Sequence, residues 1–434
     1  LCCEGMLSTS TMTELILKPI TAIRLECPTA ANVFAFIRNH QLYSIDRAEA
    51  STYADLFRFL NSGFAVLVLD GADSALVFGI QGYDKRSVSE PSGEDNVMGA
   101  KDGFIEVVRV NMSLLRRRMK TPQLKLELFV KGSKSQTDLC LCYMADRVPQ
   151  SLIAQIKARL DEMELESILS SGYLQPFLEN RRGCLFDTVG TTQRPDVLCA
   201  KLLEGRVGLL IDGTPFALVI PKLFCESFQT MDDYCYRPAY ATLVRWIKYA
   251  AFLVAVLLPA LYVAIALHHP ELLNRTLLLI LADAEENAPI SLTAEAIGVL
   301  LVYEIIREAG LRLPKAVGGA VSIVAGLIIG DAAVASGLIS TPMLTVTAIA
   351  VIAGFVVPDL AQSITLLRLA FLLIAGFWGL FGISLLGAAV LFNLCAGESF
   401  GFPITAPIAP LYKKGFRDTL TRVSFRKMQS GSFT

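Results

Sequence analysis

Residues 316–397 read AVGGAVSIVAGLIIGDAAVASGLISTPMLTVTAIAVIAGFVVPDLAQSITLLRLAFLLIAGFWGLFGISLLGAAVLFNLCAG, and this stretch decides the fold. Its 82 residues include only three charged side chains, those of Asp331, Asp359 and Arg368. A helix needs about 20 predominantly apolar residues to cross the ~30 Å hydrocarbon core of a bilayer. No core helix of a soluble protein stays apolar for so long, and the stretch has room for three membrane spans.

A fourth apolar segment lies upstream, where residues 245–267 read RWIKYAAFLVAVLLPALYVAIAL. We therefore predict an α-helical polytopic membrane domain with spans near residues 245–267, 316–337, 341–357 and 366–394. Pro259 lies inside the first span and lacks a backbone N–H. We expect it to kink that helix and to leave one carbonyl without its helical partner.

A more polar helix is expected at about residues 292–309. It carries three acids that are candidates for an intramembrane polar site, Glu295, Glu304 and Glu308. Glu304 and Glu308 are neighbours on one helix face, and Glu295 lies roughly opposite Glu304. The helix is too polar for lipid contact all round. It is re-entrant, interfacial, or a fifth span whose acids line water.

The second predicted span has a small residue at every fourth position, at Gly318, Ser322, Gly326 and Gly330. Small residues at this spacing let helix backbones approach each other closely in a membrane. Asp331 follows directly, and a carboxylate inside a membrane is costly enough to be a functional candidate. We expect this face to pack helices or to line a pore. The alternative is that Asp331 lies at the membrane boundary or caps a broken helix.

The first half of the chain has globular patterning and contains an internal repeat. Residues 56–78 and 198–220 align without a gap at an offset of 142, with Leu, Gly, Asp-Gly and Ala-Leu-Val in register. Each copy predicts a short helix that ends at Gly, a buried strand, a turn at Asp-Gly and a second strand. The region is therefore predicted to be α+β.

We divide the chain into two α+β soluble subdomains, the membrane domain and a basic tail, at residues 1–145, 146–242, 243–397 and 398–434. The first span is preceded by Arg237, Arg245 and Lys248. The tail contains six basic residues, Lys413, Lys414, Arg417, Arg422, Arg426 and Lys427. By the positive-inside rule both ends face the cytoplasm, which requires an even number of crossings.

Composition and motifs argue against several function classes. A net charge of −1 gives no electrostatic reason to expect a nucleic-acid partner. The ten cysteines form no Cys-x-x-Cys pair, so we expect no metal; Cys140 and Cys142 should point to one face of a strand and pack in a core. No phosphate loop, Gly-x-Ser-x-Gly or His-Glu-x-x-His motif is present, so we expect neither an enzyme nor a cofactor. Residues 1–20 lack the pattern of a signal peptide.

At this level of detail the chain resembles the A subunit of GerA-type spore germinant receptors, over about residues 55–420. The segments that carry the resemblance are YDKRSVSEP (83–91), NMSLLRRRMKTPQLKLE (111–127), ILSSGYL (168–174), RPDVLCAKLLEGRVGLLIDGTPFALVIP (194–221), LLPALYVAIALHHPEL (257–272), EIIREAGLRLPKAVGGAVSIVAGLIIGDAAV (304–334) and PIAPL (407–411). Residues 186–196, FDTVGTTQRPD, depart from the aromatic-proline run and acidic residue that usually precede RPD. The start is shorter than is typical, which leaves open an incomplete first subdomain.

The resemblance implies a multi-pass protein of the inner membrane of the dormant spore. It implies a transporter-like B subunit and a lipoprotein C subunit as partners, and a complex that senses nutrients and triggers germination. The A subunit would oligomerise around an ion-conducting path, in contact with membrane lipid. Two alternatives stay open: a related protein encoded with the spore dipicolinate channel, and a secondary transporter. A transporter would usually show paired membrane halves, whereas the repeat here lies in the soluble half.

Overall fold

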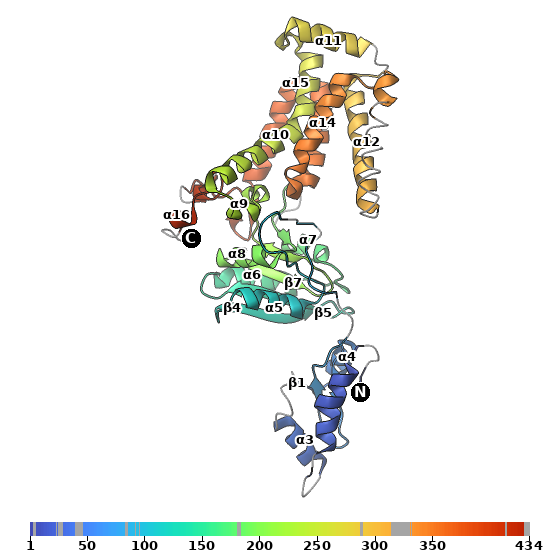
Figure 1. The fold of residues 1–434 in the computed structure, drawn as a ribbon, viewed down its shortest axis with the longest axis vertical. Coiled ribbons are helices and arrows are strands. Elements are labelled where there is room, and N and C mark those ends of the chain that lie inside the picture. The colour runs from blue at the N-terminus through green and yellow to red at the C-terminus, as the bar shows by residue number, and fades with distance from the viewer. Residues whose placement is uncertain are drawn as a thin grey trace.

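The computed structural model describes all residues except 3–5, 23, 25–28, 40–46, 83–85, 92, 95, 180–183, 287–289, 314–329, 331, 413–414 and 429–434. Three bodies follow one another along the long axis of the molecule: an N-terminal unit, a central sheet domain and a helical bundle (Figure 1). The two soluble bodies are α+β, as the sequence predicts.

The N-terminal unit is a three-stranded sheet in the order β1-β3-β2, with helices beside it. Its elements are α1 (Thr9–Met12), α2 (Lys18–Thr21), α3 (Ala30–Asn39), β1 (Arg47–Ala50), α4 (Tyr53–Asn61), β2 (Ala65–Leu67) and β3 (Ala75–Phe78). Thr52 caps α4, since its hydroxyl accepts from the backbone N–H of Asp55. β2 and β3 are buried on both faces, against α4 on one side and the N-terminal helices on the other.

The central domain is built on a five-stranded antiparallel sheet in the order β4-β5-β7-β8-β6. Its strands are β4 (Leu124–Lys131), β5 (Thr137–Met144), β6 (Gly190–Thr192), β7 (Val207–Ile211) and β8 (Ala217–Ile220). Its helices are α5 (Val108–Arg118), α6 (Gln150–Asp161), α7 (Gln175–Leu178), α8 (Pro195–Leu203) and α9 (Asp232–Cys235). The boundary predicted at residue 145 does not separate the two sheets, because this sheet joins strands from both sides of it.

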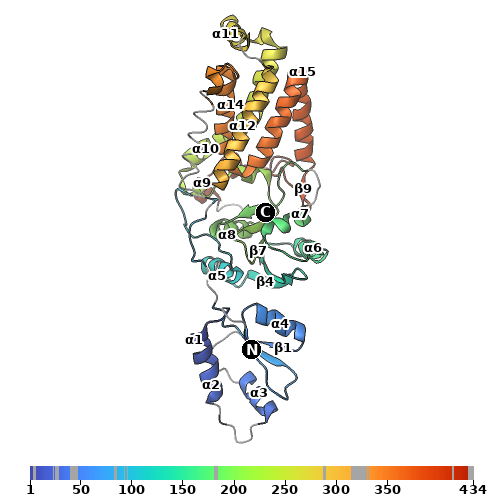
Figure 2. The ribbon, with the colours of Figure 1, turned by 90° about the vertical axis from the view of Figure 1, so that its right-hand side faces the viewer.

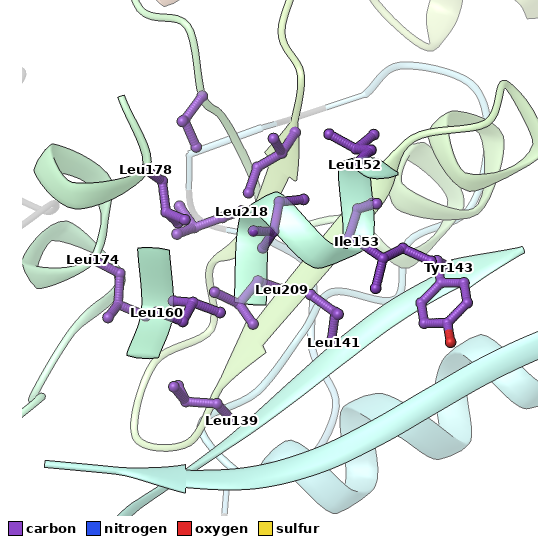
Figure 3. Close-up of a cluster of buried hydrophobic side chains, with 14 of the residues drawn as sticks. Leu139, Leu141, Tyr143, Leu152, Ile153, Leu160, Leu174, Leu178, Leu209 and Leu218 are labelled. Carbon is purple, nitrogen blue, oxygen red and sulfur yellow. The ribbon is translucent and has the colours of Figure 1, made fainter. Parts of the chain in front are cut away.

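Alternating side chains of β5 supply two hydrophobic cores, one on each face of the sheet. Leu139, Leu141 and Tyr143 face α6 and α7, where Figure 3 shows them among leucines and isoleucines of those helices. Cys140 and Cys142 face α5 and α8 and are fully buried, with their sulfurs 3.8 Å apart. The prediction that both cysteines pack in a core is confirmed, and the sheet lies between two helical layers.

The internal repeat is confirmed at the level of strand register. Ala65 pairs with Phe78 in the first copy and Val207 with Ile220 in the second, so adding 142 to each residue number converts one pair into the other. Gly71 and Gly213 turn these hairpins with φ of 82° and 86°, a conformation that glycine adopts without strain. The copies share a helix, a turn and an antiparallel hairpin.

The similarity extends one strand beyond the predicted repeat. β1 pairs with β3 through Ala48 and Val77, and β6 pairs with β8 through Gly190 and Val219, again at an offset of 142. The repeated unit is therefore strand–helix–strand–strand. In the second copy the β4–β5 hairpin adds two further strands, since β5 pairs along β7.

The bundle contains α10 (Pro238–His268), α11 (Arg275–Glu286), α12 (Leu292–Arg312), α14 (Thr341–Phe355) and α15 (Ala361–Cys395). Among the described residues, two segments are long and apolar enough to cross a membrane, Pro238–His268 and Pro358–Cys395. The span predicted at 341–357 corresponds to α14, whose 15 residues extend only about 22 Å. The span predicted at 316–337 lies largely outside the described residues and stays a prediction.

The span predicted at 366–394 is wrong, because α15 folds back on itself at Gly379. That residue has φ 57° and ψ −143°, which no right-handed helix contains. Both ends of α15 reach the same residue of the central domain: Ser363 Oγ donates to the Leu185 carbonyl at 2.6 Å, and Asn393 Oδ1 accepts from the Leu185 N–H at 3.2 Å. The two arms lie side by side in Figure 2, with the turn at the end of the bundle far from the central domain.

The predicted tail is not a free extension. β9 (Glu398–Ser399) and β10 (Phe402–Pro403) form a small hairpin, and α16 (Phe425–Met428) follows near the end of the chain. Ser399 Oγ donates to the Thr188 carbonyl at 3.0 Å, and Phe400 belongs to the core beneath α6. The residues after α15 therefore return to the central domain and pack on it.

A glycine substitution tests the turn in α15. A Cβ at Gly379 would lie 2.9 Å from His268 Cβ and would hold a positive φ, so Gly379→Ala should lower the free energy of unfolding by about 1–3 kcal/mol. Gly387 lies in the second arm with nothing within 4 Å of its Cβ position, and Gly387→Ala should leave stability unchanged or slightly raised. Thermal unfolding of both purified variants decides it. Equal thermal midpoints for Gly379→Ala and Gly387→Ala would contradict the turn at Gly379.

Candidate functional site

A buried ion-pair cluster joins the central domain, the start of the bundle and the C-terminal segment, residues 415–428. Arg245 of α10 is 0% exposed. Its Nε donates to Asp233 Oδ2 of α9 at 2.9 Å, and its Nη1 donates to Asp418 Oδ1 at 3.0 Å. The consecutive helices α9 and α10 and a segment more than 170 residues further along the chain therefore meet at one guanidinium. We name this cluster, with Lys248 and Tyr234, the junction.

Lys248 and Tyr234 complete the junction. Lys248 Nζ donates to Thr230 Oγ1 at 3.0 Å and lies 3.3 Å from Asp233 Oδ1. The Tyr234 hydroxyl donates to Asp418 Oδ2 at 2.7 Å, and burial together with Asp418 raises the pKa of Tyr234 well above its usual value. Each carboxylate thus accepts from at least two donors, which offsets the cost of removing these charges from water.

The C-terminal segment is held along α10 by further hydrogen bonds. The indole N–H of Trp246 donates to the Leu420 carbonyl at 2.9 Å. The Arg422 N–H donates to Thr242 Oγ1 at 3.0 Å, and the Arg422 guanidinium lies 4.5 Å from the centre of the Phe425 ring. Arg245, Lys248 and Arg422 were predicted as basic flanks for the membrane surface. All three are buried, because carboxylates and backbone carbonyls of the protein itself surround them.

Two adjacent acids in α9 connect the junction to the rest of the central domain. Asp232 accepts from the backbone N–H groups of Val97 and Met98, at 3.1 and 2.9 Å. Asp233 accepts from the bundle residues Arg245 and Lys248. The short helix α9 is therefore bonded on one side to a loop of the central domain and on the other side to the bundle.

The loop that contacts α9 is itself tied to the repeated unit. Arg194, 2% exposed, donates to the Ala100 carbonyl at 2.9 Å and to both carboxylate oxygens of Asp196. Glu94 accepts from Thr192 Oγ1 and the Gln193 N–H, at 2.8 and 3.0 Å. A continuous chain of hydrogen bonds thus runs from β6 through this loop and α9 to α10.

A second buried cluster stabilises the central domain where the chain leaves the repeat. Glu226 accepts from Lys201 Nζ at 2.8 Å and from Arg206 Nη1 at 2.5 Å. Burial alone would raise the pKa of Glu226, but Arg206 and Lys201 outweigh it and lower that pKa to about 2. The same carboxylate accepts from the Leu223 N–H at 3.1 Å. This cluster fixes the segment that leads to α9.

Arg368 occupies the interior of the bundle. Its side chain is 4% exposed, its Nε donates to the Ala255 carbonyl of α10 at 2.7 Å, and its Nη2 donates to the Ala350 carbonyl of α14 at 3.2 Å. The Ala255 carbonyl is the one that Pro259 leaves without a helical donor, because proline has no N–H. Arg368 therefore supplies the donor that the sequence predicts to be missing, and it ties α10, α14 and α15 together.

The three candidate acids of α12 serve three different roles. Glu295 is 1% exposed, and its Oε1 accepts from the N–H and the hydroxyl of Ser340 at 2.6 and 2.8 Å, so it caps the start of α14. Glu304 accepts from Thr365 Oγ1 at 3.0 Å and pairs with Arg307. Glu308 is exposed and pairs with Arg312. The acids do not share one site, because two bond to different neighbouring helices and the third faces outward.

The small-residue face is mostly untested. Gly318, Ser322, Gly326 and Asp331 lie outside the described residues. Gly330 lies in a helix, and a Cβ there would meet Leu344 Cδ2 at 3.7 Å, an ordinary contact. The structure therefore shows no close backbone approach at Gly330, and the packing role of the other positions stays a prediction.

The sequence interpretation missed the junction and the role of Arg368. Arg368 was visible as the only basic residue of the 316–397 stretch, and Pro259 was visible as a source of a free carbonyl. The sequence does not show that Arg368 and the carbonyl left free by Pro259 lie side by side. Asp233 and Asp418 gave no signal of their own, since acids in polar segments are common. In the part of the chain that the structure describes, no group of three or more His, Cys, Asp or Glu residues could hold a metal.

Comparison with known proteins identifies the family. A family model described as Bacillus/Clostridium GerA spore germination protein matches residues 1–432. The chain belongs to this family. Spore germination protein KA of Bacillus subtilis is 39% identical over 380 residues, which cover 87% of this chain and 70% of that protein. Spore germination protein B1 of the same organism is 31% identical, covering 97% and 87%.

The chain is also similar to a second Bacillus subtilis protein and to one solved structure. The Bacillus subtilis protein YfkQ, described as an uncharacterized membrane protein, is 38% identical and covers 84% of this chain and 72% of its own length. The crystal structure of the N-terminal domain of the A subunit of the Bacillus megaterium spore germinant receptor GerK3 is 38% identical. It covers 28% of this chain and 97% of that domain, with a TM-score of 0.24.

The lowered pKa of Glu226 predicts a pH dependence of stability. Since its folded pKa of about 2 lies below its unfolded pKa of about 4.3, its contribution is present above pH ~4.3 and is lost as the pH falls toward ~2. In denaturant unfolding between pH 7 and 2, the free energy of unfolding of the native chain should fall more steeply with decreasing pH than that of Glu226→Gln. Glu90→Gln changes an exposed pair with Lys101 and should leave the profile unchanged. Parallel profiles for the native chain and Glu226→Gln would contradict the assignment.

Breaking the junction should loosen the C-terminal segment. Arg245→Met leaves the buried carboxylates of Asp233 and Asp418 without their main partner, so we expect a loss of about 3–5 kcal/mol in unfolding free energy. Limited proteolysis should cut within 415–428 sooner than in the native chain. Arg417 is exposed in the same segment, and Arg417→Met serves as the matched control. If both variants are cut at the native rate, the junction does not hold the segment.

Proposed function

We propose that this chain is the A-type membrane subunit of a nutrient germinant receptor in a bacterial endospore. In this role it acts with a transporter-like B subunit and a lipoprotein C subunit, and it helps to convert nutrient binding into germination. The family match over residues 1–432 is the observation that carries the proposal. We assign it no catalytic step, no cofactor and no nucleic-acid partner.

The junction supports a role in passing a signal between the soluble region and the bundle. α9 is bonded to the central domain through Asp232 and to α10 through Asp233. A shift of the loop around Val97 and Met98 would therefore act on the start of α10. Buried, mutually bonded charges favour a few discrete arrangements over a continuous range, as a switching element requires.

We place the bundle in the inner spore membrane, with the soluble region and the C-terminal segment on the cytoplasmic side. α10 leaves the central domain, and both ends of the α15 hairpin return to it through Leu185. The C-terminal segment then binds α9 and α10. These contacts support the proposal that both ends of the chain lie on one side, as an even number of crossings requires.

Oligomerisation around an ion path is part of the same proposal. Large apolar side chains are exposed on the outer surfaces of several bundle helices. Lipid or further copies of the chain would cover them. Those more than 60% exposed are Leu279, Ile305, Leu311, Ile352, Phe355, Leu366, Phe377, Phe381, Leu391 and Phe392. The path itself would be lined by residues contributed from several copies.

The second candidate function is that of the related proteins encoded with the dipicolinate channel, which share this architecture. A third, secondary transport, is less well supported, since the duplicated unit lies in the soluble region and not in the bundle. Adjacent genes for B- and C-type subunits would mark a nutrient receptor, and a dipicolinate-channel operon would mark the alternative.

Gene deletion distinguishes these functions. In the source organism, spores without this chain should fail to germinate with one nutrient class and respond normally to others, and the native gene should restore the response. Arg245→Met should reduce the restored rate at least tenfold at a normal protein level, while Arg417→Met restores it fully. Equal slowing with every nutrient would favour the dipicolinate-channel class, and uptake of substrate by vesicles containing this chain alone would favour transport.

A further inference from the structure

α10 is longer than a membrane crossing requires. Its 31 residues extend about 46 Å, whereas the hydrocarbon core is ~30 Å thick and needs about 20 residues. About ten residues therefore remain outside the core. These lie at the start of the helix, because Arg245 and Lys248 are bonded there to the central domain.

This first third of α10 has an apolar face that the protein leaves uncovered. Tyr240, Leu243, Trp246 and Ile247 are 54%, 53%, 56% and 51% exposed. On the opposite face Ala241, Arg245 and Lys248 are buried against α9 and the C-terminal segment. The helix thus presents apolar side chains outward and its charged ones inward, the reverse of a surface helix in water.

The surroundings of this face are aromatic and basic. Phe425, 56% exposed, lies beside Arg422, which is bonded to Thr242 of the same helix turn. Arg237, Arg417 and Arg426 are exposed. Arg237 directly precedes α10, and Arg426 belongs to α16, which lies near the start of α10 in Figure 1. On the opposite side of α10, Asp233 and Asp418 are paired with Arg245.

We propose that the face formed by Tyr240, Leu243, Trp246, Ile247 and Phe425 binds the headgroup layer of an anionic membrane surface. Tyr and Trp rings favour that layer because one end is apolar and the other can hydrogen-bond. Exposed arginines around such a face attract anionic lipid. α10 would enter the membrane obliquely, with its first turns resting on the cytoplasmic leaflet.

The binding orients the junction. Trp246 contacts lipid with its ring and holds the Leu420 carbonyl with its N–H, so the same residue joins the membrane surface to the C-terminal segment. A lipid contact here would fix the angle between α10 and the central domain. This inference rests on the membrane location proposed above.

The two tryptophans of the chain, Trp246 and Trp378, allow a direct test. Trp378 is 60% exposed beside the turn of α15, at the far end of the bundle. Trp378→Phe leaves Trp246 as the only tryptophan, and Trp246→Phe leaves Trp378. Each full-length variant is reconstituted in vesicles of phosphatidylcholine and phosphatidylglycerol that carry a quencher at the headgroup, at acyl carbon 5 or at acyl carbon 12.

We expect Trp246 fluorescence to be quenched at least twofold more by the headgroup and carbon-5 labels than by the carbon-12 label. Quenching only by aqueous acrylamide would show that the face is in water, and shielding from every quencher would show that another copy of the chain covers it. Strongest quenching by carbon 12 would place it in the core. Each of these results overturns the proposal.

The reciprocal variant separates this inference from the membrane location itself. Lipid quenching of Trp378 without lipid quenching of Trp246 would reject only the surface contact. No lipid quenching of either tryptophan would reject the membrane location as well.

The basic residues are tested by comparing brominated phosphatidylglycerol with brominated phosphatidylcholine as quenchers of Trp246. We expect the anionic lipid to quench more strongly, and the ratio to fall to about one in Arg237→Gln/Arg426→Gln. Arg312→Gln, an exposed arginine on α12, should leave the ratio unchanged. A ratio that is insensitive to Arg237 and Arg426 would overturn the electrostatic part of the proposal.

Discussion

The bundle depends on one hydrogen bond, from the Arg368 side chain to the Ala255 carbonyl. Pro259 removes the N–H that this carbonyl would use within α10, and the site is buried from water. A buried carbonyl without a donor costs about 1–3 kcal/mol, so the broken helix needs a donor from outside. The arginine that supplies it also reaches α14, and three helices are thereby held at one point. The charged side chain of Arg368 in this apolar segment therefore has a structural role.

The same constraint explains the second break in the bundle. At Gly379 the helix reverses, and the Gly376 carbonyl there is bonded to His268 Nε2 at 3.0 Å, from the last turn of α10. Each interruption of a helix is thus satisfied by a polar side chain of a neighbouring helix. α10 is therefore bonded to neighbouring segments at its far end and also at its start, where Arg245 binds Asp233 and Asp418.

The soluble fold was predictable because its signals are local. The repeat at offset 142 and its Asp-Gly turns follow from alternation and turn residues, and the strand registers confirm them. The sequence predicts that the bundle helices are apolar, but it does not predict where the chain reverses direction. Residues 366–394 are predominantly apolar throughout, and the reversal depends on the backbone conformation of Gly379. Arg245 and Lys248 were placed at the membrane surface because the sequence cannot show that Asp233 and Asp418 come together around them. Long-range contacts of this kind depend on the assembled fold.

A double-mutant cycle between Pro259 and Arg368 tests the central claim most directly. Pro259→Ala restores the N–H that Ala255 lacks, so Arg368→Met should destabilise the Pro259→Ala protein less than it destabilises the native chain. Unfolding free energies of the full-length protein and its three variants, measured in one detergent, give the coupling. We expect the two costs of Arg368→Met to differ by about 1–3 kcal/mol. Equal costs in both backgrounds would contradict it, since Arg368 would then act independently of the carbonyl that Pro259 leaves free.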